Sequence, residues 1–127
     1  MHITPVYASI LGLLFVGLSA RTLRLRGKLG IAIGDSGNQQ MLRVIRVHSN
    51  FAEYVPLALL LIYFTEVQGA SARFIHIVCL CLLAGRLLHA YGVSQVNEQL
   101  GFRVVGTAMT LGTIVVASAN LLFREWQ

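Results

Sequence analysis

The stretch ITPVYASILGLLFVGLSA, residues Ile3–Ala20, carries no charged side chain and is followed at once by Arg21. A helix that crosses the hydrocarbon core of a bilayer needs about 20 predominantly apolar residues. This stretch therefore predicts a membrane-spanning helix. Val104–Phe123 is a second stretch of this kind, and its small residues, Gly106 and Gly112 among them, allow a neighbouring helix to approach closely.

Two further apolar stretches, Tyr54–Thr65 and Phe74–Gly85, are too short to cross a membrane by themselves. The first must extend backwards through Glu53, and the second must extend forwards through Arg86. Both middle helices are therefore polar at one end. We predict four helices and a glycine-rich first loop, with helices over residues 3–24, 38–66, 72–93 and 100–124 and the loop over Leu25–Gln40.

The composition of the whole chain supports a membrane protein. Of its 127 residues, 56% are hydrophobic and only 12% are charged, whereas soluble domains carry about 25% charged residues. A soluble domain of this size cannot bury so much apolar surface, because small domains have a high ratio of surface to volume. These numbers exclude a water-soluble monomer and a disordered chain. We predict a single domain over residues 1–127, folded as an all-α integral membrane four-helix bundle.

The basic residues predict the orientation in the membrane. The net charge is +5, which in a soluble protein would suggest nucleic acid as a partner. Basic residues also flank membrane spans on the cytoplasmic side, so no nucleic-acid partner is expected. Most Lys and Arg residues lie in or beside the first loop, which shares a side with the third loop in a four-span protein. We therefore predict cytoplasmic loops one and three and both termini outside, and the compact loops favour a bacterial inner membrane.

Four polar residues near the start of the second span share one helix face. Arg43, Arg46, Asn50 and Glu53 lie within about 80° of one another at about 100° per residue. Arginine holds carboxylates with paired hydrogen bonds, and a glutamate accepts from an ammonium group. Because ionisable residues inside a membrane helix are expensive, this face predicts a site for a small zwitterionic ligand with more acid than amine. The alternative is that these charges pair with those of neighbouring helices.

Arg86 and His89 lie three residues apart in the third span and share a face. The predicted orientation puts them on the same side of the membrane as the polar face of the second span, so the two are expected to meet in one site. His76 lies by itself in an apolar stretch, and no role is predicted for it. No group of His, Cys, Asp and Glu has metal-ligand spacing, so no metal site is predicted.

Three motifs together resemble those of the MAPEG family, the membrane-associated proteins in eicosanoid and glutathione metabolism. The segment RVIRVHSNFAEYVP, residues 43–56, resembles the family signature in the second helix. The segment GRLLHAYG, residues 85–92, resembles the third-helix pattern, and Arg103 with Gly106 and Thr107 resembles the start of the fourth helix. The motifs occur in family order and spacing, and the resemblance covers the whole chain.

The resemblance implies a homotrimer that binds glutathione, as a co-substrate, between neighbouring subunits near the cytoplasmic face. It also implies that Arg103 stabilises the glutathione thiolate by its charge, because a guanidinium does not lose its own proton. Together with Arg43 of the polar face, the residues predicted to bind glutathione are Arg21, Arg46, His48, Asn50, Glu53, Tyr54, Arg86, His89 and Tyr91.

We therefore predict a membrane-bound glutathione-dependent transferase or peroxidase that acts on lipophilic electrophiles. Two alternatives remain open. One is a non-catalytic membrane protein of the same fold that binds a lipid or serves as a scaffold, since a fold does not by itself establish catalysis. The other is a small multidrug transporter, which is disfavoured because Ile3–Ala20 lacks the embedded acid on which such proteins rely.

Overall fold

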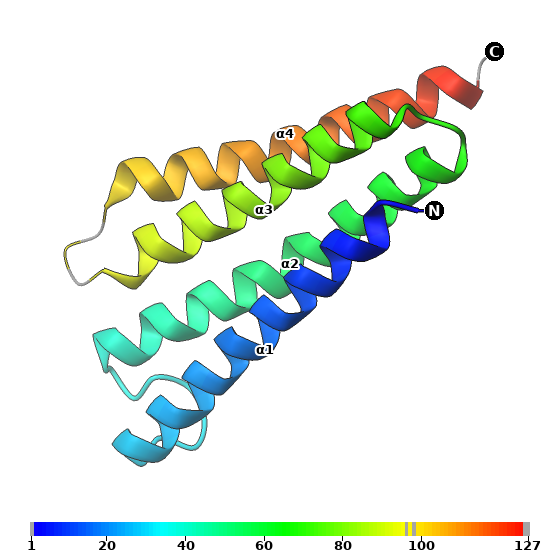
Figure 1. Ribbon diagram of the computed structural model, residues 1–127. Helices are drawn as coiled ribbons and strands as arrows, with labels where there is room; N and C mark the ends of the chain where they lie inside the picture. The colour runs from blue at the N-terminus through cyan, green and yellow to red at the C-terminus, as the bar shows by residue number, and fades with distance from the viewer. Residues whose placement is uncertain (1, 96, 98, 126–127) are drawn as a thin grey trace.

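The computed structural model describes residues 2–95, 97 and 99–125. It is a bundle of four long helices, α1 (Thr4–Leu29), α2 (Gln39–Val67), α3 (Ala72–Ser94) and α4 (Leu100–Glu125) (Figure 1). Each helix contains a segment that is long and apolar enough to cross a membrane. All regular secondary structure of the described residues is helical, so the predicted all-α class and the four spans are confirmed.

The two ends of the bundle hold different parts of the chain (Figure 1). The start of α1, the turn between α2 and α3 and the end of α4 lie at one end, which we call the terminal end. The C-termini of α1 and α3 and the N-termini of α2 and α4 lie at the other, which we call the loop end. The first and third connections therefore share a side, as four successive crossings require.

The first helix is longer than predicted. We expected a loop over Leu25–Gln40, but α1 continues to Leu29, and the last two residues of that segment already belong to α2. Gly30 ends α1 with a left-handed φ of 67° and donates its backbone N–H to the Arg26 carbonyl oxygen. Glycine adopts this conformation without steric cost and commonly ends helices. The prediction was wrong because every glycine of the segment was interpreted as a helix breaker, whereas an earlier glycine remains helical.

Side-chain caps fix where the two middle helices begin. The Asn38 side-chain oxygen accepts a hydrogen bond of 2.9 Å from the backbone N–H of Met41 at the start of α2. The Ser71 hydroxyl accepts one of 3.3 Å from the backbone N–H of Phe74 at the start of α3. Such caps satisfy backbone donors that have no partner within the helix. Farther along, Pro56 lies inside α2, and the helix continues past it to Val67.

Two glycines let α3 and α4 pack with their backbones in contact. A Cβ atom added at Gly106 would lie 2.5 Å from the carbonyl oxygen of Gly85 and 2.6 Å from the backbone nitrogen of His89. A Cβ atom added at Gly85 would in turn lie 3.0 Å from the carbonyl oxygen of Gly106. Small residues at such crossings are the usual means of close helix packing in membranes. This contact sets how near α4 lies to the polar residues of α3.

The interior of the bundle is apolar, and much of the outer surface is apolar too. Leu11, Ala58, Ile62 and Leu82 are completely buried between the helices. Large apolar side chains on all four helices are exposed, and Leu13 of α1 is 74% exposed. An outer surface of this kind suits lipid or another subunit, not water.

At the terminal end, polar groups pair within the chain. The Glu66 carboxylate, near the end of α2, accepts hydrogen bonds from the backbone N–H groups of Ile3 and Thr4 at the start of α1. Tyr7 of α1 and His76 of α3 are joined by a hydrogen bond of 3.0 Å. His76 therefore has an interhelical partner that the sequence did not indicate.

Candidate functional site

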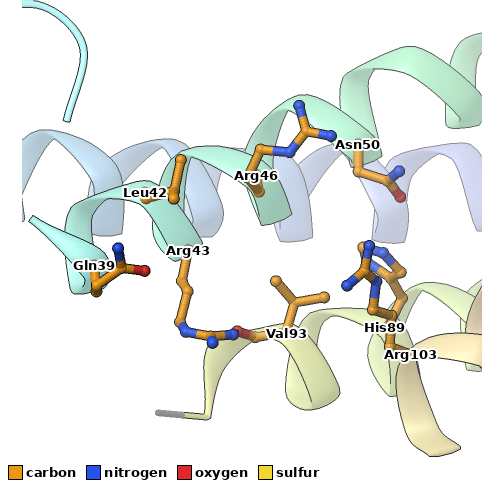
Figure 2. A pocket seen from close by; sticks show the side chains of 8 residues that line it. All are labelled: Gln39, Leu42, Arg43, Arg46, Asn50, His89, Val93 and Arg103. Carbon is orange, nitrogen blue, oxygen red and sulfur yellow. The ribbon is translucent and has the colours of Figure 1, made fainter. Parts of the chain in front are cut away.

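A polar cleft of about 210 Å³ lies at the loop end, between α2, α3 and α4. The part of its wall that belongs to α2 comes from the first three turns of that helix, and His89, Val93 and Arg103 close it from the other side. In Figure 2, Arg43 extends from α2 toward Val93 and Asn50 points toward His89, whereas the Arg46 guanidinium points away from Val93. The lining residues are Gln39, Leu42, Arg43, Arg46, Asn50, His89, Val93 and Arg103.

The cleft is strongly cationic. Three arginines line it, from two different helices, and no acidic residue is among the lining residues in the part of the chain that the structure describes. Arg43 donates a hydrogen bond of 3.2 Å to the carbonyl oxygen of Val93, which holds the end of α3 against α2. Arg46 and Arg103 are exposed, whereas His89 is buried. Such a set of guanidinium groups suits carboxylates, because each can donate two parallel hydrogen bonds.

Arg86 lies behind the cleft and connects three helices. Only 2% of its surface is exposed. It donates a hydrogen bond of 2.6 Å to the side-chain oxygen of Asn50 on α2 and one of 3.4 Å to the carbonyl oxygen of Gly106 on α4. Its guanidinium carbon lies 5.9 Å from the centre of the Tyr54 ring, within the range of a cation–π contact. Its Nε has no hydrogen-bond partner among the described residues.

This arrangement fixes the orientation of the Asn50 amide. Because the side-chain oxygen of Asn50 accepts from Arg86, the amide nitrogen remains as the donor that this side chain presents to a ligand. The close contact of α3 with α4 at Gly106 also brings the Gly106 carbonyl within reach of Arg86. Arg86 is thus a positioning residue for Asn50 in the single chain and does not itself line the cleft.

The structure brings together five of the eleven residues predicted for the site. They come from α2, α3 and α4, so the expectation that the polar ends of the second and third spans meet in one place is confirmed. The five residues that line the cleft are Arg43, Arg46, Asn50, His89 and Arg103.

The other six predicted residues lie outside the cleft of the single chain. Besides Arg86 and Tyr54, Arg21 donates a hydrogen bond of 2.7 Å to the Ser94 hydroxyl. Glu53 is exposed on α2. The remaining two are His48 and Tyr91, which contact side chains outside the cleft.

His48 faces α1 and not the cleft. Its Nε2 forms a hydrogen bond of 2.9 Å with the Ser19 hydroxyl, and its ring stacks on Phe15 at 4.8 Å between centroids. Tyr91 is 53% exposed, and its ring meets Phe102 edge to face at 5.4 Å. Neither side chain lines the cleft of the single chain, and their predicted roles at glutathione stay predictions.

Three lining residues were missed from the sequence, namely Gln39, Leu42 and Val93. Gln39 lies four residues before Arg43 and seven before Arg46, so the helix periodicity that grouped the arginines also includes it. Val93 lies four residues after His89 and follows from the same rule. Leu42 and Val93 were overlooked because the search considered only polar side chains.

Comparison with known proteins agrees with this architecture. The sequence profile of the MAPEG family matches residues 4–123. The chain belongs to the MAPEG family. The resemblance predicted from the three motifs is thereby confirmed, although membership in the MAPEG family does not specify an activity.

Two relatives match nearly the whole length of this chain. The inner membrane protein YecN of Escherichia coli K12 is 34% identical over 126 residues, which are 98% of this chain and 95% of the relative. The inner membrane protein YecN of Escherichia coli O6:H1 matches with the same identity and coverage. With its four apolar helices, the chain is a multi-pass integral membrane protein, and the predicted inner-membrane location is confirmed. The predicted orientation of the loops stays a prediction.

Proposed function

We propose that this protein is a membrane-bound glutathione-dependent transferase or peroxidase that acts on lipophilic electrophiles. The observation that carries the proposal is the cationic cleft, in which Arg43, Arg46 and Arg103 converge with Asn50 and His89. Glutathione has two carboxylates, one ammonium group and one thiol. In the proposed complex, the guanidinium groups of Arg43 and Arg46 bind the carboxylates, and the amide nitrogen of Asn50 donates to the peptide backbone of the ligand.

A second copy of the chain completes the proposed site. The cleft of about 210 Å³ is smaller than the roughly 300–1,000 Å³ of typical small-molecule sites. Glu53 lies on the exposed face of a membrane-spanning helix, where a carboxylate facing lipid is costly. A neighbouring subunit that covers this face would shield Glu53 and place it against the ammonium group of the ligand. We therefore propose the homotrimer that the family implies.

The proposed chemistry uses the thiolate of glutathione as the nucleophile. Arg103 stabilises that thiolate by its positive charge, and the thiol proton passes to solvent. In a transferase reaction, the sulfur lone pair forms a bond to an electrophilic carbon, and the leaving group departs with the electrons of its own bond. In a peroxidase reaction, the thiolate attacks the peroxide, the O–O bond breaks, and a second glutathione completes a disulfide while the peroxide is reduced to an alcohol and water.

A second candidate is the non-catalytic lipid-binding protein of the same fold. It is favoured by an apolar groove of about 290 Å³ on the opposite face of α2, lined by residues that include Leu11, Phe15, Phe51 and Pro56. This groove suits an acyl chain, and it is equally suited to a lipophilic substrate. The two candidates differ in whether the cationic cleft activates a thiol.

Titration of the detergent-purified protein with glutathione, followed by the ultraviolet absorbance of the thiolate, distinguishes them. We expect a saturable thiolate signal that Arg103→Leu abolishes and that a control at the terminal end, Arg73→Leu, retains. In turnover with an electrophilic aryl halide, Arg103→Leu should lower kcat by about 10²–10³-fold, as for loss of one group that stabilises a developing anion.

Two results would contradict the proposal. Glutathione binding without thiolate formation would support the lipid-binding candidate, and absence of binding would remove glutathione as the ligand. The mass of the protein in detergent tests the assembly separately. A monomer or a dimer that still binds glutathione would contradict the trimeric part of the proposal.

A further inference from the structure

The last two turns of α1 carry exposed basic side chains that the proposed glutathione site does not use. Arg24 and Lys28 are exposed, and neither forms a hydrogen bond or an ion pair within the described part of the chain. Arg26, on a different face of the helix, donates to the carbonyl oxygens of Ile31 at 3.3 Å and Gly34 at 2.9 Å. Arg26 therefore holds the loop, whereas Arg24 and Lys28 face away from the protein.

The length of α1 puts Arg24 at the edge of the membrane. From Thr4 to Arg24 the helix rises about 30 Å at about 1.5 Å per residue, which matches the roughly 30 Å hydrocarbon core of a bilayer. When Thr4 lies at one edge of that core, Arg24 lies at the other edge, at the level of the phospholipid headgroups. Lys28 lies one turn farther into the headgroup region.

The same face of α1 is apolar farther down the helix. Val6, Ile10 and Leu13 are 55%, 44% and 74% exposed. At about 100° per residue, these three side chains lie within about 60° of Arg24 and Lys28 on the helix surface. We call these five residues the basic-capped stripe of α1. This exposed face is cationic at one edge of the membrane and apolar from Leu13 onward, and Ile10 and Val6 continue the apolar part into the opposite leaflet.

We propose that the basic-capped stripe binds an anionic phospholipid. Its headgroup phosphate lies between Arg24 and Lys28, and its acyl chains run along α1 within the same leaflet as far as Leu13, about 16 Å from Arg24 along the helix axis. The charge complementarity favours an anionic lipid over a zwitterionic one. Arg24 and Lys28 are separated by one turn, where like charges repel, and an anion between them relieves this repulsion. The proposal does not depend on the glutathione site.

Native mass spectrometry of the full-length protein tests this proposal, with phosphatidylglycerol and phosphatidylcholine supplied together in detergent. We expect phosphatidylglycerol to be retained in preference to phosphatidylcholine. Arg24→Gln should lower its relative affinity about fivefold, and the double change Arg24→Gln with Lys28→Gln about 25-fold, from the known contribution of basic residues near a membrane surface. The charge-conserving double change Arg24→Lys with Lys28→Arg should retain the preference.

The controls separate this surface from general electrostatic attraction and from loss of folding. Arg73→Gln, an exposed basic residue at the terminal end, should leave the preference unchanged, and soluble glycerol phosphate should not displace the lipid. Thermal unfolding of the double variant should match that of the unchanged protein. The proposal is overturned if the unchanged protein retains both lipids equally, or if the double variant still prefers phosphatidylglycerol. It is also overturned if Arg73→Gln lowers that preference as much as the double variant does, or if glycerol phosphate displaces the lipid.

Discussion

At the terminal end of the bundle the Glu66 carboxylate accepts from the backbone at the start of α1, and Tyr7 is bonded to His76. At the loop end, arginines from α2 and α4 surround a cleft, and the buried Arg86 has a hydrogen-bonding nitrogen without a partner among the described residues. Both ends place polar groups in an apolar environment, where each unpaired group is costly.

The two ends differ in what their polar groups contact. Glu66 satisfies backbone N–H groups at a helix N-terminus, where a negative charge is also favoured by the helix dipole. This carboxylate joins α2 to α1, so its role is in stability. The arginines of the loop end line a space large enough to admit part of a ligand. The comparison indicates that the terminal end stabilises the fold and that the loop end is suited to binding, and four substitutions test it.

The largest effect is expected from Gly106→Ala, which disrupts the close contact between the backbones of α3 and α4. The new Cβ atom would lie 2.5 Å from the Gly85 carbonyl oxygen and 2.6 Å from the His89 nitrogen. These are backbone atoms, so α3 and α4 must move apart. We expect the free energy of unfolding to fall by about 1–3 kcal/mol or more and glutathione binding to be lost, as measured by thermal unfolding in detergent and by titration.

The matched control is Gly112→Ala on the same helix, where a Cβ atom would have no neighbour within 4 Å. Alanine favours a helix over glycine by up to about 1 kcal/mol, so the control should be as stable as the unchanged protein or more so. Equal behaviour of the two variants would show that the close approach of α3 and α4 does not organise the cleft.

Arg86→Met is expected to separate binding from stability. Arg86 has no acidic partner among the described residues, so Met at this position removes the desolvation cost of a buried cation without leaving an opposite charge unpaired. The Asn50 amide, however, loses the hydrogen bond that orients it. We expect unchanged or higher thermal stability together with about 10–100-fold weaker glutathione binding, equivalent to about 1.4–2.7 kcal/mol. Weaker binding accompanied by loss of folding would contradict a positioning role.

The smallest effects come from the same change at two carboxylates of α2. Glu66→Gln weakens the charge-assisted hydrogen bonds to the start of α1, and the free energy of unfolding should fall by about 1–2 kcal/mol with glutathione affinity unchanged. Glu53→Gln should do the reverse, with affinity about tenfold lower and thermal unfolding of the subunit unchanged. If both variants lose stability and retain binding, the distinction between the two ends is incorrect.

Much of the fold followed from the sequence because a membrane imposes strong local constraints. A charge-free stretch such as Ile3–Ala20 has few alternatives to a spanning helix, and the four predicted helices match those observed except at the end of α1. That end depended on which glycine adopts a positive φ. Gly27 remains helical, and Gly30 is the first of three successive glycines there, with Gly34 and Gly37, that have a positive φ.

The site was predictable in part for a similar reason. Helix periodicity placed Arg43, Arg46 and Asn50 on one face, and all three line the cleft. Periodicity within one helix does not reveal which side chain of another helix is opposite. The family resemblance assigned His48 to the ligand, and the structure adds that it bonds to Ser19 of α1. The resemblance also assigned Arg86 to the ligand, and the structure adds its hydrogen bond to Asn50; both ligand roles stay predictions.

The sequence by itself determined the four spans, the family and the polar faces of α2 and α3, because these depend on the order and spacing of residues along the chain. Only the tertiary structure decided that Arg86 lies behind the cleft and orients Asn50 while Arg103 lies at its edge. The physical reason is that this outcome depends on how closely α3 and α4 approach at Gly85 and Gly106. The distance between two helices is a property of their packing and is not encoded in the periodicity of either one.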